Sequence, residues 1–187
     1  MQVFIKNMVC DRCKMMVKVE FEKLGLNPIN VKLGEVEIKE HELSAIQQHN
    51  LATGLSKLGF ELLTDKKKQV VAQLKSLIVE VVHYKENGLA VNLSDYLSQQ
   101  LATNYAQLSA IFSTIEHDTI EQFFIRQKIE KAKELLTYGE KSLSEIAYLL
   151  NYSSVAHLSA QFKKITNQTA SDYKKSQDLK RSTLDEV

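Results

Sequence analysis

Apolar positions in the first 65 residues follow the two-residue alternation of short strands, interrupted twice by the wider spacing of helices. The alternating residues are Val3 and Ile5, then Ile29, Val31 and Leu33, then Val36 and Ile38, then Phe60 and Leu62. The helical positions are Met16, Val19 and Leu24, and then Leu43, Ile46, Leu51, Leu55 and Leu58. This order, βαββαβ, predicts a ferredoxin-like α+β domain over residues 1–65. A core of that size is marginal by itself, so we expect it to pack against another domain or subunit.

The second and third strands are expected to form a hairpin. The phase of the alternation flips at Gly34 and Glu35, which predicts a two-residue loop with the glycine supplying a positive φ at its first position. That loop would place Leu33 opposite Val36 in the hairpin.

Residues 66–87 begin with three lysines and continue with apolar residues at helical spacing, which predicts a linking amphipathic helix. Positions 70, 74, 77 and 81 alternate steps of four and three, as in a coiled coil. Two interpretations stay open: a helix packed on its own chain, or a short seam between two chains of a homodimer. Glu86–Gly88 is the best candidate for a domain boundary.

The last hundred residues contain an internal repeat, because residues 92–112 align without gaps over residues 142–162. In each copy a serine, Ser94 or Ser144, precedes an acidic residue, which predicts a helix N-cap. A polar break then precedes a second helix, and an apolar pattern over 120–136 predicts a helix that connects the copies. The pattern predicts an all-α domain with two helix-turn-helix units. The positions expected in its core are Leu108, Phe112, Leu158 and Phe162.

Composition bounds the class of protein. The chain has 187 residues with 44% hydrophobic and 25% charged residues, so it should fold as one or two globular domains. The net charge of +1 gives no whole-chain attraction to nucleic acid or to a membrane. We expect a cytoplasmic protein with no membrane partner, because Lys6 and Asp11 interrupt the opening segment before a signal-peptide core could form.

Charge is distributed unevenly between the two copies. No Lys or Arg occurs from Asn87 to Ile125, whereas Lys163 and Lys164 lie in the second helix of the second copy. The second copy is therefore expected to bind DNA phosphates. The first copy would be a weaker DNA reader or a contact surface for RNA polymerase. Lys180 and Arg181, near the end of the chain, are more simply explained as a solvated tail.

The segments 123–136 and 143–164 resemble the DNA-binding domain of the AraC/XylS transcriptional regulators, over a domain expected at residues 88–187. The resemblance implies a reader of double-stranded DNA that places two recognition helices in successive major-groove segments. By position, the implied DNA contacts are Ala106, Ser109 and Ala110 in the first copy, and Ala156, His157, Ser159, Ala160, Lys163 and Lys164 in the second. The chain departs from the family at Ala110 and Ala160, where Arg is frequent, and at Asn151-Tyr152, where Gly-Phe is frequent.

Cys10 and Cys13 are the only cysteines, and their three-residue spacing suits a metal or redox pair. Two thiols in the first turn of a helix should have lowered pKa values, and soft sulfur favours Cu(I) or Zn(II). The segment from Met8 to Cys13 is similar to the MxCxxC loop of heavy-metal-associated domains. Further ligands would come from Met8, from an exogenous thiol or from a second chain. A thiol switch without metal and a pair of cysteines with no role are the other interpretations.

Together these patterns favour a transcriptional regulator that responds either to a soft metal ion bound by Cys10 and Cys13 or to the oxidation state of these two thiols. The alternative is a metal-trafficking or scaffold protein whose helical half binds a protein partner. Enzymatic function is not expected, because the chain has no glycine-rich phosphate loop, nucleophile elbow or paired-carboxylate pattern.

Overall fold

The computed structural model describes residues 1–85, 89, 91–176 and 183–184. The boundary expected at Glu86–Gly88 and the tail residues Lys180 and Arg181 lie outside the described residues. The strands are β1 (Gln2–Lys6), β2 (Pro28–Lys32), β3 (Glu35–Ile38) and β4 (Glu61–Leu63). The helices are α1 (Asp11–Lys23), α2 (Ala45–Lys57), α3 (Lys66–His83), α4 (Leu93–Leu101), α5 (Tyr105–Glu116), α6 (Ile120–Tyr138), α7 (Leu143–Leu149), α8 (Val155–Thr166) and α9 (Ala170–Lys175).

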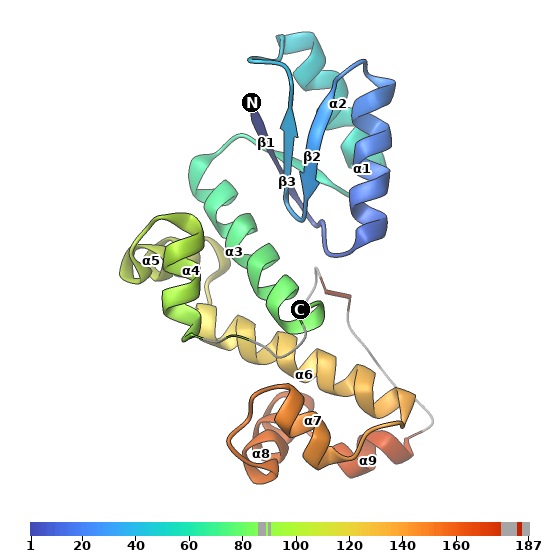
Figure 1. Cartoon of the computed structure of the whole chain (residues 1–187), viewed down its shortest axis with the longest axis vertical. Helices are drawn as coiled ribbons and strands as arrows, with labels where there is room; N and C mark the ends of the chain where they lie inside the picture. The colour runs from blue at the N-terminus through green and yellow to red at the C-terminus, as the bar shows by residue number, and fades with distance from the viewer. Residues whose placement is uncertain (86–88, 90, 177–182, 185–187) are drawn as a thin grey trace.

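The strands form one antiparallel sheet in the order β2-β3-β1-β4, at the top of Figure 1. Helices α1 and α2 cover one face of this sheet, and a shared core of fully buried side chains, including Ile5, Phe21 and Leu51, holds them there. The structure confirms the predicted βαββαβ order of elements and the four short strands. Residues 1–65 are called the N-terminal module below.

The hairpin between β2 and β3 differs from the prediction by one residue. Lys32 pairs with Glu35, so the loop is Leu33-Gly34, and the glycine takes its second position with a φ of 76°. The prediction that Leu33 lies opposite Val36 is therefore wrong. A Cβ on Gly34 would lie 2.5 Å from the hydroxyl oxygen of Ser76 on α3, so a larger residue would have to displace that hydroxyl as well as adopt a strained backbone conformation.

The predicted apolar faces of α1 and α2 are only partly right. Met16 and Val19 are 45% and 46% exposed, whereas Val17 and Phe21, four residues apart, are fully buried. In α2 the sheet-facing side holds Leu51, as predicted, but Ile46 is 74% exposed. Apolar spacing over two or three turns does not determine which side of a helix faces the sheet, because that side depends on the direction in which the chain enters the helix.

Helix α3 is buried on two sides. Val71, Leu74, Ile78 and Val81 pack into a core with α4, α5 and the start of α6. On another side, Ala72 and Val79 lie against the N-terminal module, which α3 also contacts at β1 and β4. The coiled-coil-like stripe is therefore buried in its own chain, as the first of the two interpretations required, and it is not available as a seam between two chains.

The C-terminal part contains two helix-turn-helix units, α4–α5 and α7–α8, joined by the long helix α6 (Figure 1). Ile120 and Phe123 at the start of α6 belong to the first core, and Ile129 and Leu136 further along it belong to the second. One helix therefore runs through both cores and fixes the two units relative to each other. The four predicted core residues Leu108, Phe112, Leu158 and Phe162 are fully buried.

The N-caps of the units differ from the prediction. Helices α4 and α7 begin one residue before Ser94 and Ser144, and their N-caps are Asn92 and Ser142. Ser142 forms a capping box with Glu145, in which each side chain bonds the other residue's backbone N–H. None of the described helices is long and apolar enough to span a membrane.

Candidate nucleic-acid interface and thiol loop

The second helix of each unit is held by a polar residue in the preceding turn. Asn104 accepts a hydrogen bond of 2.9 Å from the backbone N–H of Gln107, and Ser154 accepts one of 3.1 Å from that of His157. Both contacts satisfy backbone N–H groups that the first turn of a helix leaves free. The polar breaks expected from the sequence are therefore the N-caps of α5 and α8.

The residues expected to contact DNA lie on the outer side of these two helices. The opposite side of each helix faces the core: Leu108 and Phe112 of α5 are buried, and so are Leu158 and Phe162 of α8. The exposed candidates are Ala106, Ala110, Ala156, His157, Ala160, Lys163 and Lys164, while Ser109 and Ser159 are half-buried. Small side chains at four of these positions would let a second molecule approach the backbone of both helices closely.

Helix α8 carries the cations of this surface. Lys163 and Lys164 are exposed in its last turn, and neither forms an ion pair with any residue that the structure describes. Helix α5 has no basic residue and ends in Glu116, which is paired with Lys75 of α3 at 3.0 Å. Attraction for phosphate is therefore concentrated in the second unit.

The turn before α8 explains one departure from the AraC/XylS pattern. Asn151 has a φ of 52°, the left-handed conformation that glycine adopts most easily and asparagine next. The ring of the following residue, Tyr152, packs edge-on against His157 at 5.3 Å between ring centroids. His157 is also bonded to Ser153 and Gln161, at 3.1 Å and 3.2 Å. These contacts fix the position of His157 at the exposed start of α8.

The thiol loop, residues Asn7–Cys13, joins β1 to α1. Cys10 is the N-cap of α1, and the two sulfur atoms of Cys10 and Cys13 lie 3.4 Å apart. The expected lowering of both thiol pKa values is not found at Cys13. Burial raises the pKa of that thiol, and this effect outweighs the hydrogen bond from the Val9 backbone, which lowers it.

Of the further ligands considered, Met8 is unsuitable, because its side chain is 2% exposed and belongs to the core of the N-terminal module. No cluster of three or more His, Cys, Asp or Glu side chains suited to a metal ion occurs in the part of the chain that the structure describes. The donor set is thus two thiols. Two sulfur ligands fit a soft ion of low coordination number such as Cu(I), and they are two short of the four ligands of a structural zinc site.

Two interacting residues could not be recognised from the sequence. Tyr84, directly after α3, donates a hydrogen bond of 2.7 Å to the carbonyl oxygen of Val9 in the thiol loop. Lys128 of α6 lies over the rings of Phe124 and Tyr152, and burial lowers its pKa to about 8. The four-residue spacing of Phe124 and Lys128 places them on one side of α6, but only the tertiary structure brings Tyr152 to them.

Comparisons with known proteins agree with this geometry. Residues 97–176 match a protein family described as "Helix-turn-helix domain". The probable transcriptional regulator LumQ of Photobacterium leiognathi is 26% identical over 146 residues, which cover 76% of this chain and 57% of that relative. The likeness to this relative therefore reaches beyond residues 97–176, but the chain spans little more than half of the relative's length.

Two solved structures are similar to the C-terminal part. The C-terminal domain of AraT, a response regulator from Geobacillus stearothermophilus, has a TM-score of 0.50 at 19% identity, covering 64% of this chain and 92% of that one. An AraC-type transcriptional regulator from Chromobacterium violaceum has a TM-score of 0.52 at 18% identity, covering 59% and 96%. Residues 97–176 therefore carry a helix-turn-helix domain, and the C-terminal part has a fold similar to that of these two structures.

Proposed function

We propose that this chain regulates transcription by inserting α5 and α8 into successive major-groove segments of one DNA duplex. The observation that carries the proposal is the pair of helix-turn-helix units built on the single helix α6, each with small or polar residues on the exposed side of its second helix. Helices held on one connector must lie about one DNA turn, ~34 Å, apart to enter the groove together. One copy of the chain supplies both helices, so the proposal does not require a homodimer.

In this proposal the two helices do different work. Lys163 and Lys164 bind phosphates from α8, and His157 contacts a base edge or phosphate at the start of that helix. Ala106, Ser109 and Ala110 on α5, and Ala156, Ser159 and Ala160 on α8, contribute apolar contacts with thymine methyl groups, hydroxyl hydrogen bonds and fit to DNA shape. Because α5 has no basic residue, its exposed side is also the candidate contact surface for RNA polymerase.

We further propose that the N-terminal module is a ferredoxin-like, heavy-metal-associated-like domain. It senses either a soft metal ion or the oxidation state of its own two thiols. Cys10 and Cys13 would hold the ion, and the thiol pair supplies the soft ligands that Cu(I) prefers. An oxidant that accepts two electrons and two protons would instead join the same two sulfur atoms as a disulfide. Support comes from the position of the loop, since Tyr84 connects it directly to the end of α3.

Selection of binding sites from random duplex DNA tests the proposal, using reduced protein with and without Cu(I) or Zn(II). Enrichment of one sequence, bound more weakly as salt rises, supports DNA recognition; no enrichment under any condition contradicts it and favours a protein partner for the helical part. A metal effect on affinity of about 5- to 150-fold is the range typical of allosteric effectors. The double variant Cys10→Ser/Cys13→Ser should bind the same DNA without that effect, and an unchanged metal effect in this variant would exclude the thiols as the sensor.

A further inference from the structure

A cleft of about 620 Å³ lies between the N-terminal module and the first helix-turn-helix unit. Its walls come from the start of α1, from the β2–β3 hairpin, from α3 and from α4. A volume of this size and a position between two domains are both typical of small-molecule sites. The cleft is separate from the exposed sides of α5 and α8 and contains neither cysteine.

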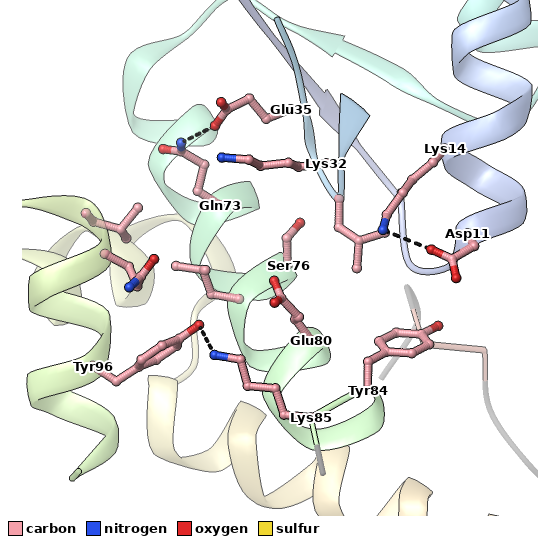
Figure 2. A pocket seen from close by; sticks show the side chains of 14 residues that line it. Asp11, Lys14, Lys32, Glu35, Gln73, Ser76, Glu80, Tyr84, Lys85 and Tyr96 are labelled. Atoms are coloured by element: carbon pink, nitrogen blue, oxygen red, sulfur yellow. Dashed lines mark hydrogen bonds and ion pairs between the residues drawn. The ribbon is translucent and has the colours of Figure 1, made fainter. Parts of the chain in front are cut away.

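Polar side chains dominate the lining, as Figure 2 shows. Ser76 and Glu80 on α3 and Tyr84, its C-cap, follow one another at intervals of four, so they form a polar stripe on the side of the helix that faces the cleft. The opposite wall is held in place at the hairpin, where Gly34 packs directly against Ser76. A ligand in this cleft would therefore meet two walls that already contact each other.

Most charged groups of the cleft have partners within it. Lys14 pairs with Asp11 at 2.9 Å, and Glu35 accepts a hydrogen bond of 3.1 Å from Gln73. Lys85 lies 4.4 Å from the centre of the Tyr96 ring and donates to its hydroxyl. These six side chains therefore have few unsatisfied polar groups left for a ligand.

Two opposite charges have no such partner. The carboxylate of Glu80 on α3 and the ammonium of Lys32 on β2 make no hydrogen bond or ion pair with any of the residues that the structure describes, and both lie in the cleft (Figure 2). Glu80 is half-buried and lines the cleft together with Ser76, four residues before it, and Tyr84, four residues after it. A carboxylate in a cleft that is also lined by tyrosine rings is suited to an ammonium group. An amine at Glu80 would still leave Lys32 free for a carboxylate.

From this arrangement we propose that the cleft binds a small zwitterion of the amino-acid type, a free amino acid or a short peptide. Its ammonium group pairs with Glu80, and its carboxylate pairs with Lys32. A molecule held by both residues bridges α3 and the N-terminal module, so binding stabilises the arrangement of the two parts seen here. The proposal does not depend on DNA binding or on metal binding at Cys10 and Cys13.

Calorimetric titration of the full chain tests this site without DNA. The probes are the twenty common amino acids and the dipeptides that each forms with alanine, followed by the N-acetylated and C-amidated forms of any that bind, which remove one charge each. At least one zwitterion should bind, and both blocked forms should bind about tenfold more weakly or worse, the loss expected when a hydrogen bond to a charged group is removed.

Glu80→Gln and Lys32→Gln should each cause a similar loss of affinity. Glu37→Gln and Lys39→Gln, exposed positions outside the cleft, are the matched controls and should bind as the wild type does. The proposal fails if no probe binds, if a blocked form binds as tightly as its parent, or if the two cleft variants retain wild-type affinity while remaining folded by circular dichroism.

Discussion

The hydroxyl of Tyr84 donates a hydrogen bond to the carbonyl oxygen of Val9, across 75 residues of sequence and at a distance of 2.7 Å. Val9 directly precedes Cys10 in the thiol loop, and Tyr84 directly follows α3, the helix whose other side belongs to the core of the first helix-turn-helix unit. This hydrogen bond is one of the contacts that join the thiol loop to α3, and α3 in turn belongs to the core of the first helix-turn-helix unit.

Tyr84→Phe removes this hydrogen bond while keeping the ring. We expect a small loss of stability, at the low end of about 0.5–1.5 kcal/mol, because the 47% exposed side chain lets water replace the hydroxyl. The ratio of DNA affinities with and without Cu(I) should fall toward one. Tyr148→Phe, at an 81% exposed tyrosine, is the control and should keep the wild-type ratio. An unchanged ratio in both variants would mean that the signal takes another route.

Gly34→Ala should destabilise the chain for two separable reasons. The positive φ of 76° costs a non-glycine residue about 1–3 kcal/mol, and the new methyl group meets the Ser76 hydroxyl at 2.5 Å. Gly25→Ala shares a φ of 72° but meets no atom within 4 Å, so it measures the backbone cost alone. In urea unfolding, Gly34→Ala should cost more than Gly25→Ala, and Ser76→Ala should remove most of the excess. Equal costs would show that the hairpin does not press on α3.

The same hairpin shows where the sequence pattern reaches its limit. Alternation located both strands, but it could not decide between loops at 33–34 and at 34–35, because the choice depends on which loop position the positive φ of Gly34 occupies. The contact with Ser76, which comes from a helix 42 positions later, cannot be read from local spacing. The predicted loop was therefore one residue too late, and Val36 pairs with Val31, two residues before the predicted partner Leu33.

The helical part was more predictable because its sequence repeats. Two copies of Leu and Phe four residues apart identified the buried sides of α5 and α8, and the exposed sides followed from helical geometry. The role of α3 in the first core was not determined, since its apolar stripe fits an intramolecular core and an intermolecular seam equally well. The Glu80–Lys32 cleft and the Tyr84 contact join distant elements, so no local pattern indicates them.

Lys128 should give the stability of the chain a distinct pH dependence. Burial lowers its pKa to about 8 in the folded state, from an ordinary value of 10.5. Between these values the unfolded chain binds more protons than the folded chain, so this lysine's contribution to stability rises with pH; below about pH 8 its burial cost is present in full. Lys128→Met should therefore gain stability relative to the wild type at pH 7, and the gain should shrink between pH 8 and 10. Urea unfolding at several pH values measures the difference, and parallel curves would contradict it.

Ala160→Leu probes the exposed side of α8. The added side chain should point away from the core, so the unfolding midpoint should change little, since surface substitutions are usually within about 0.5 kcal/mol. DNA affinity should fall by about tenfold or more, because the bulk lies where the proposal places the duplex. Thr137→Leu, on an exposed part of α6, serves as the control and should bind DNA normally. Loss of stability before loss of binding would show that this side of α8 faces protein instead of DNA.

The salt dependence of binding to the selected duplex tests the central claim most directly. Each phosphate contact adds about 0.9 to the slope of log affinity against log salt concentration, so Lys163→Ala and Lys164→Ala should each reduce the slope by about one unit. Lys57→Ala, at an exposed lysine at the end of α2, should leave it unchanged. A wild-type slope in both α8 variants, or no measurable affinity of the wild type for duplex DNA at low salt, would contradict the account.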